Sequence, residues 1–510
     1  MPGKNEPLKI GLALSGGGTY AIFQVGVIEA LTHDNKPGYI LDKKVKAISG
    51  TSGGAINSVF LAYDNMDLKR LKKFWSENNI ESFLKNVTLF MKNHFARLQN
   101  MNPEEIGHND VDDIPLAYSN ELIDSISSNF FSLGKHFNFD FKDLGPHLYS
   151  GSKLFDNISS FFFPYFKQVQ IIPKRLSQKV MRIFLRELLA KHLLPDWKIQ
   201  DKASCYSRIK HGIDGKGFPK ISVFIGATNI LNSSDNFFTA LATENGKYIW
   251  KFQGERYRYA ISIESILACC AVPQVFPAKK LYTYPLYEAL GYDMDNNNFY
   301  PKKLFKFKGH WGNFKPGSNE EIDGKVEGAY WDGYFISNPS LEPLIRVGCV
   351  ELLIIRLASV EDENIPEHHE EIDNRKEILI QNVTAETEIQ SIRLKNEFIE
   401  QNRHMLKDEF ESKFIRMHEI RFSKDNIIDQ IINDPAQSDF YIRMGHIAGT
   451  FFRNSYENLQ GIIDKHDLNI SLEQSEVVVD CHYETRKIKL TIRDCVNGNA
   501  YHVLNYNCDV

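Results

Sequence analysis

The most informative stretch of the sequence reads Val45-Lys46-Ala47-Ile48-Ser49-Gly50-Thr51-Ser52-Gly53-Gly54. It passes from a short apolar strand, 45–48, into a helical pattern that runs from about Gly53 to Tyr63. A G-x-S-x-G motif at such a turn strains the central serine and exposes its side chain, and small neighbours, here Gly50 and Gly54, let the backbone fold closely. The pattern predicts a nucleophile elbow with Ser52 as the nucleophile; the plain alternative is a glycine-rich tight turn.

The same alternation continues on both sides of this turn. Residues 8–14 predict a buried strand and residues 21–31 a helix, and further strands are expected at 221–228 and 350–355. Strand, helix, strand, helix at this spacing is typical of a parallel sheet covered by helices on both faces. The predicted fold class is therefore α/β.

A run of three glycines, Gly16, Gly17 and Gly18, follows the first strand and opens a helix. Backbone N–H groups at such a place point into one space, with the positive end of the helix behind them, and bind anions. The run also fits a G-x-G-x-x-A dinucleotide fingerprint, although the acid expected further on is only loosely offered by Asp42. Oxyanion binding and dinucleotide binding are both open from these residues alone.

A serine nucleophile needs a base to take its proton. Sixteen histidines offer no spacing that singles one out, although His310 or His446 are candidates for a Ser-His-Asp triad. Asp332 is more informative, because it precedes Gly333 and follows an apolar approach, an arrangement that turns a carboxylate into a cleft. An Asp-Gly pair by itself usually marks a turn.

Taken together, these motifs resemble those of the patatin-like phospholipase family, in family order over about residues 8–357. The matching pieces are Leu14-Ser15-Gly16-Gly17-Gly18, Gly50-Thr51-Ser52-Gly53-Gly54-Ala55, Ala227-Thr228-Asn229, Ser265-Ile266-Leu267-Ala268, Ala271-Val272-Pro273, Phe276-Pro277, Asp332-Gly333 and Asn338-Pro339.

The resemblance implies a three-layer α/β/α fold and a Ser52/Asp332 dyad that works without histidine. It makes Asp332 the base and the amides of Gly16, Gly17 and Gly18 the oxyanion hole. It implies hydrolysis of fatty-acyl esters of phospholipids or lysophospholipids, with no metal or other cofactor, in lipid catabolism or membrane remodelling. Two departures put substrate preference and rate in question: Thr19-Tyr20 stand where the family usually carries Arg or Lys, and Tyr334 follows Asp332-Gly333.

The chain is expected to divide into a catalytic domain, 1–357, and an accessory region, 358–510, that docks to a partner or a membrane. Within the first, residues 70–215 predict a large, mainly helical insertion or cap. Residues 161–220 carry 13 Lys+Arg against 4 Asp+Glu, and Phe161, Phe162 and Phe163 lie among them. Rings beside cations suit a peripheral membrane surface, while the core of a helical subdomain with a solvated basic face is an equal alternative.

The accessory region is expected to be mixed and mainly helical. Residues 361–420 contain 16 acids against 8 bases, and a long helix is predicted there. Its apolar ridge repeats every seven residues with largely polar companions, which indicates a helix packed on something rather than a coiled coil; the ridge is Ile378, Ala385, Ile392, Ile399 and Leu406. Alternation near the C-terminus predicts a small β element.

Composition narrows the class of protein. The formal net charge is −5, 43% of the 510 residues are hydrophobic, and no apolar run approaches the roughly eighteen residues of a membrane span. Residues 1–7 lack the apolar core of a secretory signal, and the seven cysteines form neither a disulfide framework nor a zinc pattern. We therefore expect a soluble, cytoplasmic protein in peripheral contact with membranes, with no nucleic-acid partner.

Two functions follow as hypotheses. The first is a serine-dependent lipid acyl hydrolase of the phospholipase A or lysophospholipase type. The second is a membrane-associated or partner-binding protein that retains the scaffold and hydrolyses weakly or not at all. The resembling family includes bacterial enzymes that act inside other cells and need a host protein, so a protein activator and export by a specialised route as a bacterial effector are compatible with either hypothesis.

Overall fold

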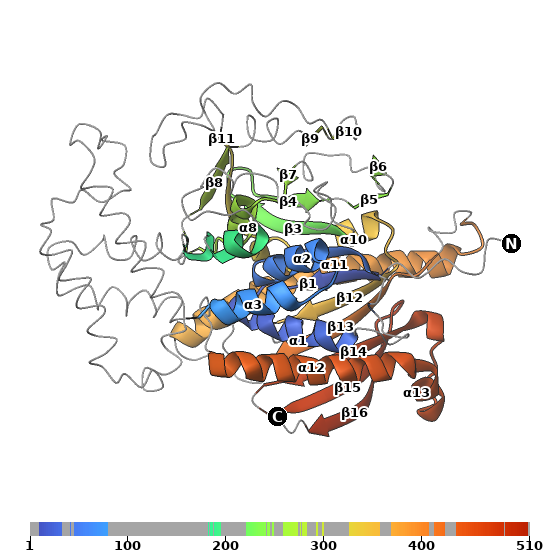
Figure 1. The fold of residues 1–510 in the computed structure, drawn as a ribbon. Coiled ribbons are helices and arrows are strands. Elements are labelled where there is room, and N and C mark those ends of the chain that lie inside the picture. The colour runs from blue at the N-terminus through green and yellow to red at the C-terminus, as the bar shows by residue number, and fades with distance from the viewer. Residues whose placement is uncertain are drawn as a thin grey trace, which may run out of the picture.

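The protein is described from a computed structural model that covers most of the sheet and its helices (Figure 1). The described residues are 10–32, 41, 45–79, 182, 184–186, 188–194, 221–240, 242–244, 247–248, 259–273, 276, 278–282, 292–293, 298–299, 326–357, 369–406, 413–423, 435–483 and 485–507. The insertion expected at 70–215, including its Phe161–Phe163 segment, lies largely outside these residues.

The strands are β1 (Ile10–Leu14), β2 (Val45–Gly50), β3 (Ser222–Asn229), β4 (Ser234–Ala240), β5 (Thr243–Glu244), β6 (Lys247–Tyr248), β7 (Tyr259–Ala260), β8 (Lys279–Tyr282), β9 (Tyr292–Asp293), β10 (Asn298–Phe299), β11 (Val326–Asp332), β12 (Glu351–Arg356), β13 (Arg416–Ser423), β14 (Ser475–His482), β15 (Lys487–Asp494) and β16 (Ala500–Asn507). The α-helices are α1 (Ile22–Leu31), α2 (Gly53–Tyr63), α3 (Lys69–Glu77), α8 (Ile263–Cys269), α10 (Glu342–Arg346), α11 (His369–Asn402), α12 (Pro435–Glu457) and α13 (Leu459–Lys465), with short 3-10 turns η1 (Gly18–Ala21), η8 (Gly333–Phe335) and η9 (Leu472–Gln474). The strands and helices predicted at the N-terminus match these bounds closely.

One sheet organises the described chain, in the order β16-β15-β14-β13-β12-β1-β2-β3-β11-β8, with β4 and β7 attached beside β3. The strands from β14 to β3 run parallel, whereas β11 pairs antiparallel with β3 and β15 antiparallel with β14. The carboxyl ends of β1 and β2 therefore lie side by side, because Leu14 is paired with Gly50. The glycine run and the serine turn, which follow these two strands, are thus brought to the same edge of the sheet.

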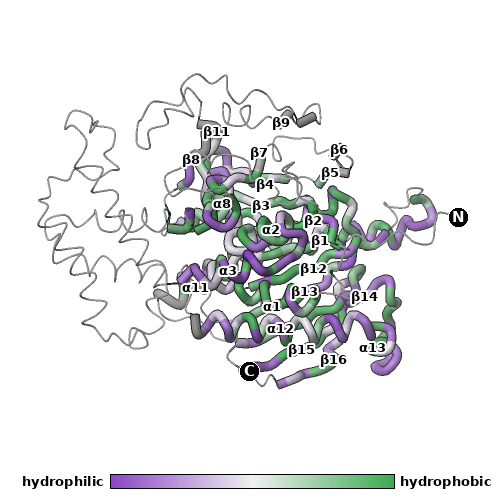
Figure 2. The backbone as a smooth tube through the Cα atoms, viewed as in Figure 1, coloured by the Kyte–Doolittle hydropathy of each residue, from purple (hydrophilic) through white to green (hydrophobic). Residues whose placement is uncertain are grey.

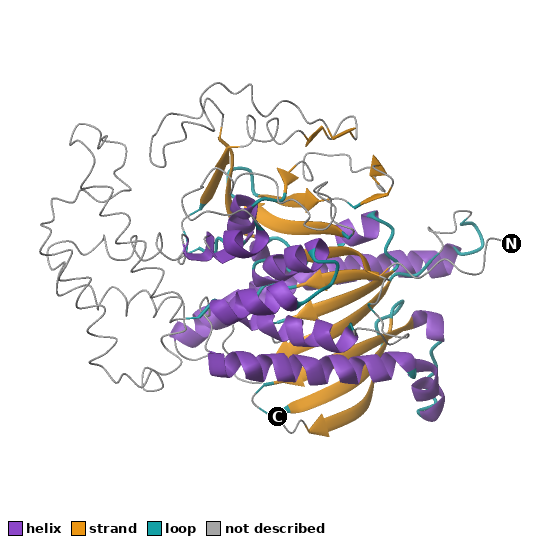
Figure 3. Ribbon diagram, in the orientation of Figure 1, coloured by secondary structure: helices purple, strands orange, loops and turns teal. Residues whose placement is uncertain are grey.

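Helices cover both faces of this sheet (Figure 3). Alternate residues of each buried strand point to opposite faces. On β1, Leu12 and Leu14 pack in the same core as α1, α2 and α12, while Ala13 packs in a second core with α10 and α11. The three-layer α/β/α architecture is confirmed. In Figure 2 the hydrophobic stretches gather around the central strands, as expected for strands buried on both faces.

The C-terminal strands continue the same sheet, because β13 pairs with β12 along the whole length of β12. Beneath them, α11 buries the predicted ridge of Ile378, Ala385, Ile392 and Ile399, while Leu406 lies just past the helix end and is half-buried. A polar residue on this face, Asn396, is also buried, and its side-chain amide is hydrogen-bonded through both its nitrogen and its oxygen.

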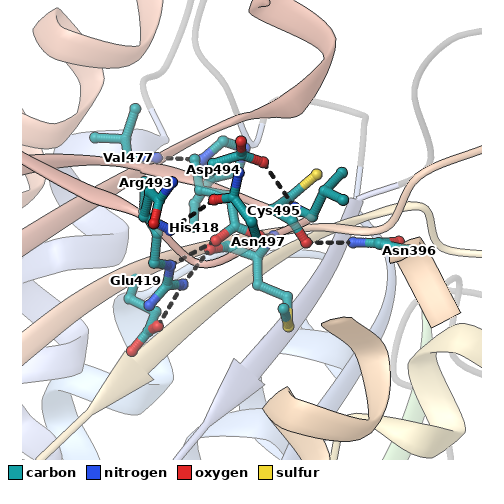
Figure 4. A network of polar contacts seen from close by, with 12 residues as sticks. Asn396, His418, Glu419, Val477, Arg493, Asp494, Cys495 and Asn497 are labelled. Carbon is teal, nitrogen blue, oxygen red and sulfur yellow. Dashed lines mark hydrogen bonds and ion pairs between the residues drawn. The ribbon is translucent and has the colours of Figure 1, made fainter. Parts of the chain in front are cut away.

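Asn396 exchanges hydrogen bonds of 2.9 Å with the backbone of Ile415, and its Nδ2 also donates to the carbonyl of Cys495 at 2.9 Å (Figure 4). A buried ion pair lies close by, in which Arg493 meets Glu419 at 2.6 Å. Buried polar groups are tolerated when they are paired in this way. The hydrogen bonds of Asn396 fix α11 to the C-terminal strands, and the ion pair joins β15 to β13.

The C-terminal helix α12 packs directly against α1 (Figure 1). The two backbones approach so closely that a Cβ atom at Gly445 would collide with the carbonyl oxygen of Phe23, and one at Gly26 with the carbonyl of Ile442. Arg453 also donates to the carbonyl of Ala30 at 3.1 Å, at the end of α1. Residues far apart in sequence thus form one helical layer. Each helix in the described part of the chain is either too short or too polar to span a membrane.

Candidate active site

Ser52 occupies the turn between β2 and α2 with φ of 51° and ψ of −124°. Positive φ in a residue other than glycine is strained backbone and is common at functional sites. The turn is also tight, because a Cβ at Gly50 would collide with Ser58 and one at Gly54 with the carbonyl of Leu14. A tight strand-to-helix turn of this kind is the geometry expected of a nucleophile elbow. Ser52 itself is 6% exposed.

The glycine run lies against this turn. A Cβ at Gly16 would be only 2.9 Å from Cβ of Ser52. The N–H of Gly16 donates to Oδ1 of Asn338 at 2.6 Å, so in this structure it is already hydrogen-bonded and not available to an oxyanion. Among the described residues, the N–H groups of Gly17 and Gly18 have no hydrogen-bond partner. These two donors stand at the start of η1, where backbone amides favour anions.

Asp332 ends β11 and is completely buried. Its backbone is fixed from two sides: its N–H donates to the carbonyl of Ala271 at 2.9 Å, and its carbonyl accepts from Oγ1 of Thr228 at 2.9 Å. Its Oδ1 accepts the N–H of Tyr334 at 3.1 Å. The motif pieces that were separate in the sequence therefore converge around this one carboxylate.

The Ser52 and Asp332 side chains are brought together. Burial raises the pKa of Asp332 from 3.8 to about 7, and the Ser52 hydroxyl and two backbone amides partly offset this rise. The two side chains do not form a hydrogen bond of ordinary geometry in this structure, and Oδ2 of Asp332 has no partner among the described residues. Catalytic hydrogen bonds are often long without substrate and tighten when it binds. A carboxylate that titrates near neutral pH is suited to take and return a proton.

A chain of hydrogen-bonded, buried side chains supports the glycine run and was not predicted from the sequence. Nε1 of Trp75 donates to Asn57 at 2.8 Å, Nδ2 of Asn57 donates to Oε1 of Gln24 at 2.9 Å, and Nε2 of Gln24 donates to the carbonyl of Ser15 at 2.8 Å. All four residues are buried. Local sequence patterns do not reveal such a chain, because its members come from different elements.

The two departures from the family pattern have defined surroundings. Tyr20 is buried, with its ring 5.2 Å edge-on from Tyr441 of α12 and 6.5 Å from Phe422 of β13. An aromatic contact with the C-terminal region thus stands where the family usually has a cation. Tyr334 is buried as well and stacks on Phe335 at 4.1 Å.

The histidine candidates receive no support from the described geometry. His446 lies exposed on α12, and His310 is outside the described residues. No histidine in the described part of the chain hydrogen-bonds to Ser52 or Asp332. No group of three or more His, Cys, Asp or Glu side chains arranged to hold a metal was found among the described residues.

Residues 12–345 match the family model described as Patatin-like phospholipase, which spans the glycine run, Ser52 and Asp332. A comparison with curated proteins gave no match. Among solved structures, the chain is similar to the crystal structure of VipD from Legionella pneumophila, with 13% identity, a TM-score of 0.32, and coverage of 88% of this chain and 67% of that one.

Proposed function

The chain belongs to the patatin-like phospholipase family, and from this premise we propose that it is a serine-dependent lipid acyl hydrolase with Ser52 as nucleophile and Asp332 as base. The observation that carries the proposal is the pairing of a strained, elbow-held Ser52 with a buried carboxylate whose pKa is raised to about 7. These are the two groups that acyl transfer through serine requires.

In the proposed acylation step, Asp332 takes the proton from Oγ of Ser52 as that oxygen attacks the ester carbonyl carbon. The tetrahedral intermediate collapses, the bond to the alcohol oxygen breaks, and the alcohol leaves with the proton from Asp332. In deacylation, Asp332 takes a proton from water, the water oxygen attacks the acyl-serine, and Ser52 regains its proton as the fatty acid leaves.

The carbonyl oxygen becomes negative in both steps and needs preorganised donors. The N–H groups of Gly17 and Gly18 supply them in the proposal, since both are unpaired among the described residues and Gly18 lies against Gly53, the residue directly after Ser52. Gly16 takes a supporting part, because its N–H holds Asn338 in this structure. The N–H of Gly53, directly after the nucleophile, is a further donor that the sequence reasoning did not single out.

We propose phospholipids or lysophospholipids as substrates, met at a membrane surface by a protein without a spanning helix of its own in the described region. The proposed lipid-facing part is Phe161, Phe162 and Phe163 with the basic residues around them. Farther along the same basic segment, Leu189 and Leu193 are buried in the core and take no part in this surface. A protein activator, a cytoplasmic location and export as a bacterial effector belong to the same proposal. The accessory role of residues 358–510, docking to a partner or a membrane, also remains a proposal.

The proposal is tested by fatty-acid release from mixed phospholipid vesicles, with and without a native or boiled eukaryotic cell extract. We expect wild type to release fatty acid and both Ser52→Ala and Asp332→Asn to fall at least roughly 10³-fold, because each removes one member of the pair. Ser76→Ala is the matched control, since Ser76 is exposed and its hydroxyl donates only to the carbonyl of Lys73 within α3.

The outcomes separate the two candidate functions. Release confined to native extract would point to a protein activator. Wild-type release that survives in Ser52→Ala would contradict a serine mechanism, and silence in every condition would favour the partner-binding function.

A further inference from the structure

The segment 337–342, which follows Asp332 and leads into α10, touches both parts of the candidate site. The carbonyl of Ser337 accepts Oγ1 of Thr51 at 2.9 Å, directly beside the nucleophile. Oδ1 of Asn338 accepts the N–H of Gly16 at 2.6 Å. A displacement of this segment would therefore move the serine turn and the glycine run together.

One carboxylate, Glu388, holds the other side of this segment. Its Oε1 accepts Oγ of Ser337 at 2.8 Å, and its Oε2 accepts the backbone N–H of Leu341 at 2.6 Å and of Glu342 at 3.0 Å. Leu341 and Glu342 begin α10, where amides have no partner within the helix. Three donors thus converge on a single side chain.

Glu388 belongs to α11, which lies outside the family match of residues 12–345. The position of α11 is itself fixed close by. The guanidinium of Arg356 at the end of β12 meets Glu386 at 2.6 Å and Oδ1 of Asn382 at 2.9 Å. Farther along the helix, Asn396 binds the C-terminal strands. The helix that bears Glu388 is therefore anchored on both sides of this residue.

We propose that Glu388 is a positioning residue of the active site, which the C-terminal region supplies to hold segment 337–342 against Thr51 and Gly16. The expected effect on catalysis rests on the proposed hydrolase function. The contact between Glu388 and segment 337–342 is independent of that function. It assigns residues beyond 357 a structural part in the site, in addition to any docking.

The contact depends on acceptors more than on charge. Burial raises the pKa of Glu388 above its usual value, partly offset by the hydrogen bonds from Leu341, Ser337 and Glu342. A glutamine can keep the geometry, because its Oε1 can accept both amides while its Nε2 donates to the hydroxyl oxygen of Ser337. Alanine leaves the amides of Leu341 and Glu342 without this partner.

The test compares Glu388→Ala and Glu388→Gln in the full chain, with Glu400→Ala as the control because Glu400 is an exposed acid on the same helix. We expect Glu388→Ala to lower kcat for lipid hydrolysis by roughly 10-fold to 100-fold with KM within about 2-fold. Glu388→Gln should stay within about 3-fold of wild type. Glu400→Ala should match wild type.

Hydrogen exchange, followed by mass spectrometry, gives a readout that needs no activity. Faster exchange over residues 333–346 and 12–20 in Glu388→Ala alone would support the inference. Unchanged exchange in both segments, or an unchanged kcat in an active enzyme, would overturn it. Faster exchange in a protein whose wild type shows no serine-dependent hydrolysis would overturn the proposed function and still support the Glu388 contact.

Discussion

At the scale of single residues, the burial of Asp332 lowers the stability of the fold and at the same time suits the residue to proton transfer. Its carboxylate is completely buried, and its Oδ2 lacks a partner among the described residues. An ionised group in such a place costs stability, and this is the origin of its raised pKa. The same environment that weakens the fold keeps the group able to exchange a proton near neutral pH.

Asp332→Asn is therefore expected to stabilise the protein as the pH rises. In wild type the penalty begins when the unfolded carboxyl ionises, near its ordinary pKa of 3.8, and is complete above the folded pKa of about 7. Asparagine does not ionise, so the free energy of unfolding of the variant should exceed that of wild type by up to roughly 4 kcal/mol at pH 8 and by much less near pH 4. Thermal unfolding at both pH values measures the difference; a variant less stable than wild type at pH 8 would contradict the account.

The sequence predicted Ser52 and Asp332 but not Glu388, for a physical reason. The serine turn limits the residue types that can surround it, so Gly50 and Gly54 mark it in the sequence. Glu388 is one acid in a strongly acidic stretch, and its role arises only from the register of α11 against segment 337–342. Gln24, Asn57 and Trp75 escaped notice for the same reason, because their contacts join separate elements.

At the scale of elements, the glycine-lined contact between α1 and α12 links the loop that bears the glycine run to the C-terminal region. Tyr20 adds an aromatic contact at the same layer, where its ring meets Tyr441. The ridge predicted from seven-residue spacing is buried on α11 at Ile378, Ala385, Ile392 and Ile399, whereas Leu406 lies past the helix end. Its partner could not be read from the sequence, since the strands it covers are distant in the chain.

Gly445→Ala should destabilise the protein although alanine favours a helix. The added Cβ would meet the carbonyl oxygen of Phe23, which is backbone and cannot rotate away. We expect a loss of roughly 1–3 kcal/mol, as for other overpacked sites. Gly461→Ala in α13 is the matched control, because Gly461 is exposed and faces only the flexible side chain of Asn458; it should gain up to about 1 kcal/mol.

Urea or thermal unfolding of both variants gives the comparison. Equal stabilisation of Gly445→Ala and Gly461→Ala would show that α1 and α12 can separate without cost, contrary to the close packing described here.

At the scale of the whole molecule, one continuous sheet carries both the family-matched region and the C-terminal strands. Parallel pairing brings the ends of β1 and β2 together, and β11 returns antiparallel so that Asp332 lies beside Ala227 of β3. The α/β class and the parallel sheet followed from the spacing of strands and helices, whereas the order of the strands is known only from the structure. The continuation of the sheet through β13 to β16 was not predicted. The composition changes after residue 357, which suggests a domain boundary even though strands on both sides of it pair in one sheet.

The most direct test of the central claim is covalent labelling of the full chain by an alkyl fluorophosphonate in the presence of phospholipid vesicles. The reagent bonds its phosphorus to an activated serine oxygen and releases fluoride. We expect mass spectrometry to place the adduct on Ser52, at a rate that rises with pH around 7 and falls at least roughly 100-fold in Asp332→Asn. An adduct on another serine, or labelling of Ser52 at the same rate in Asp332→Asn, would contradict the account.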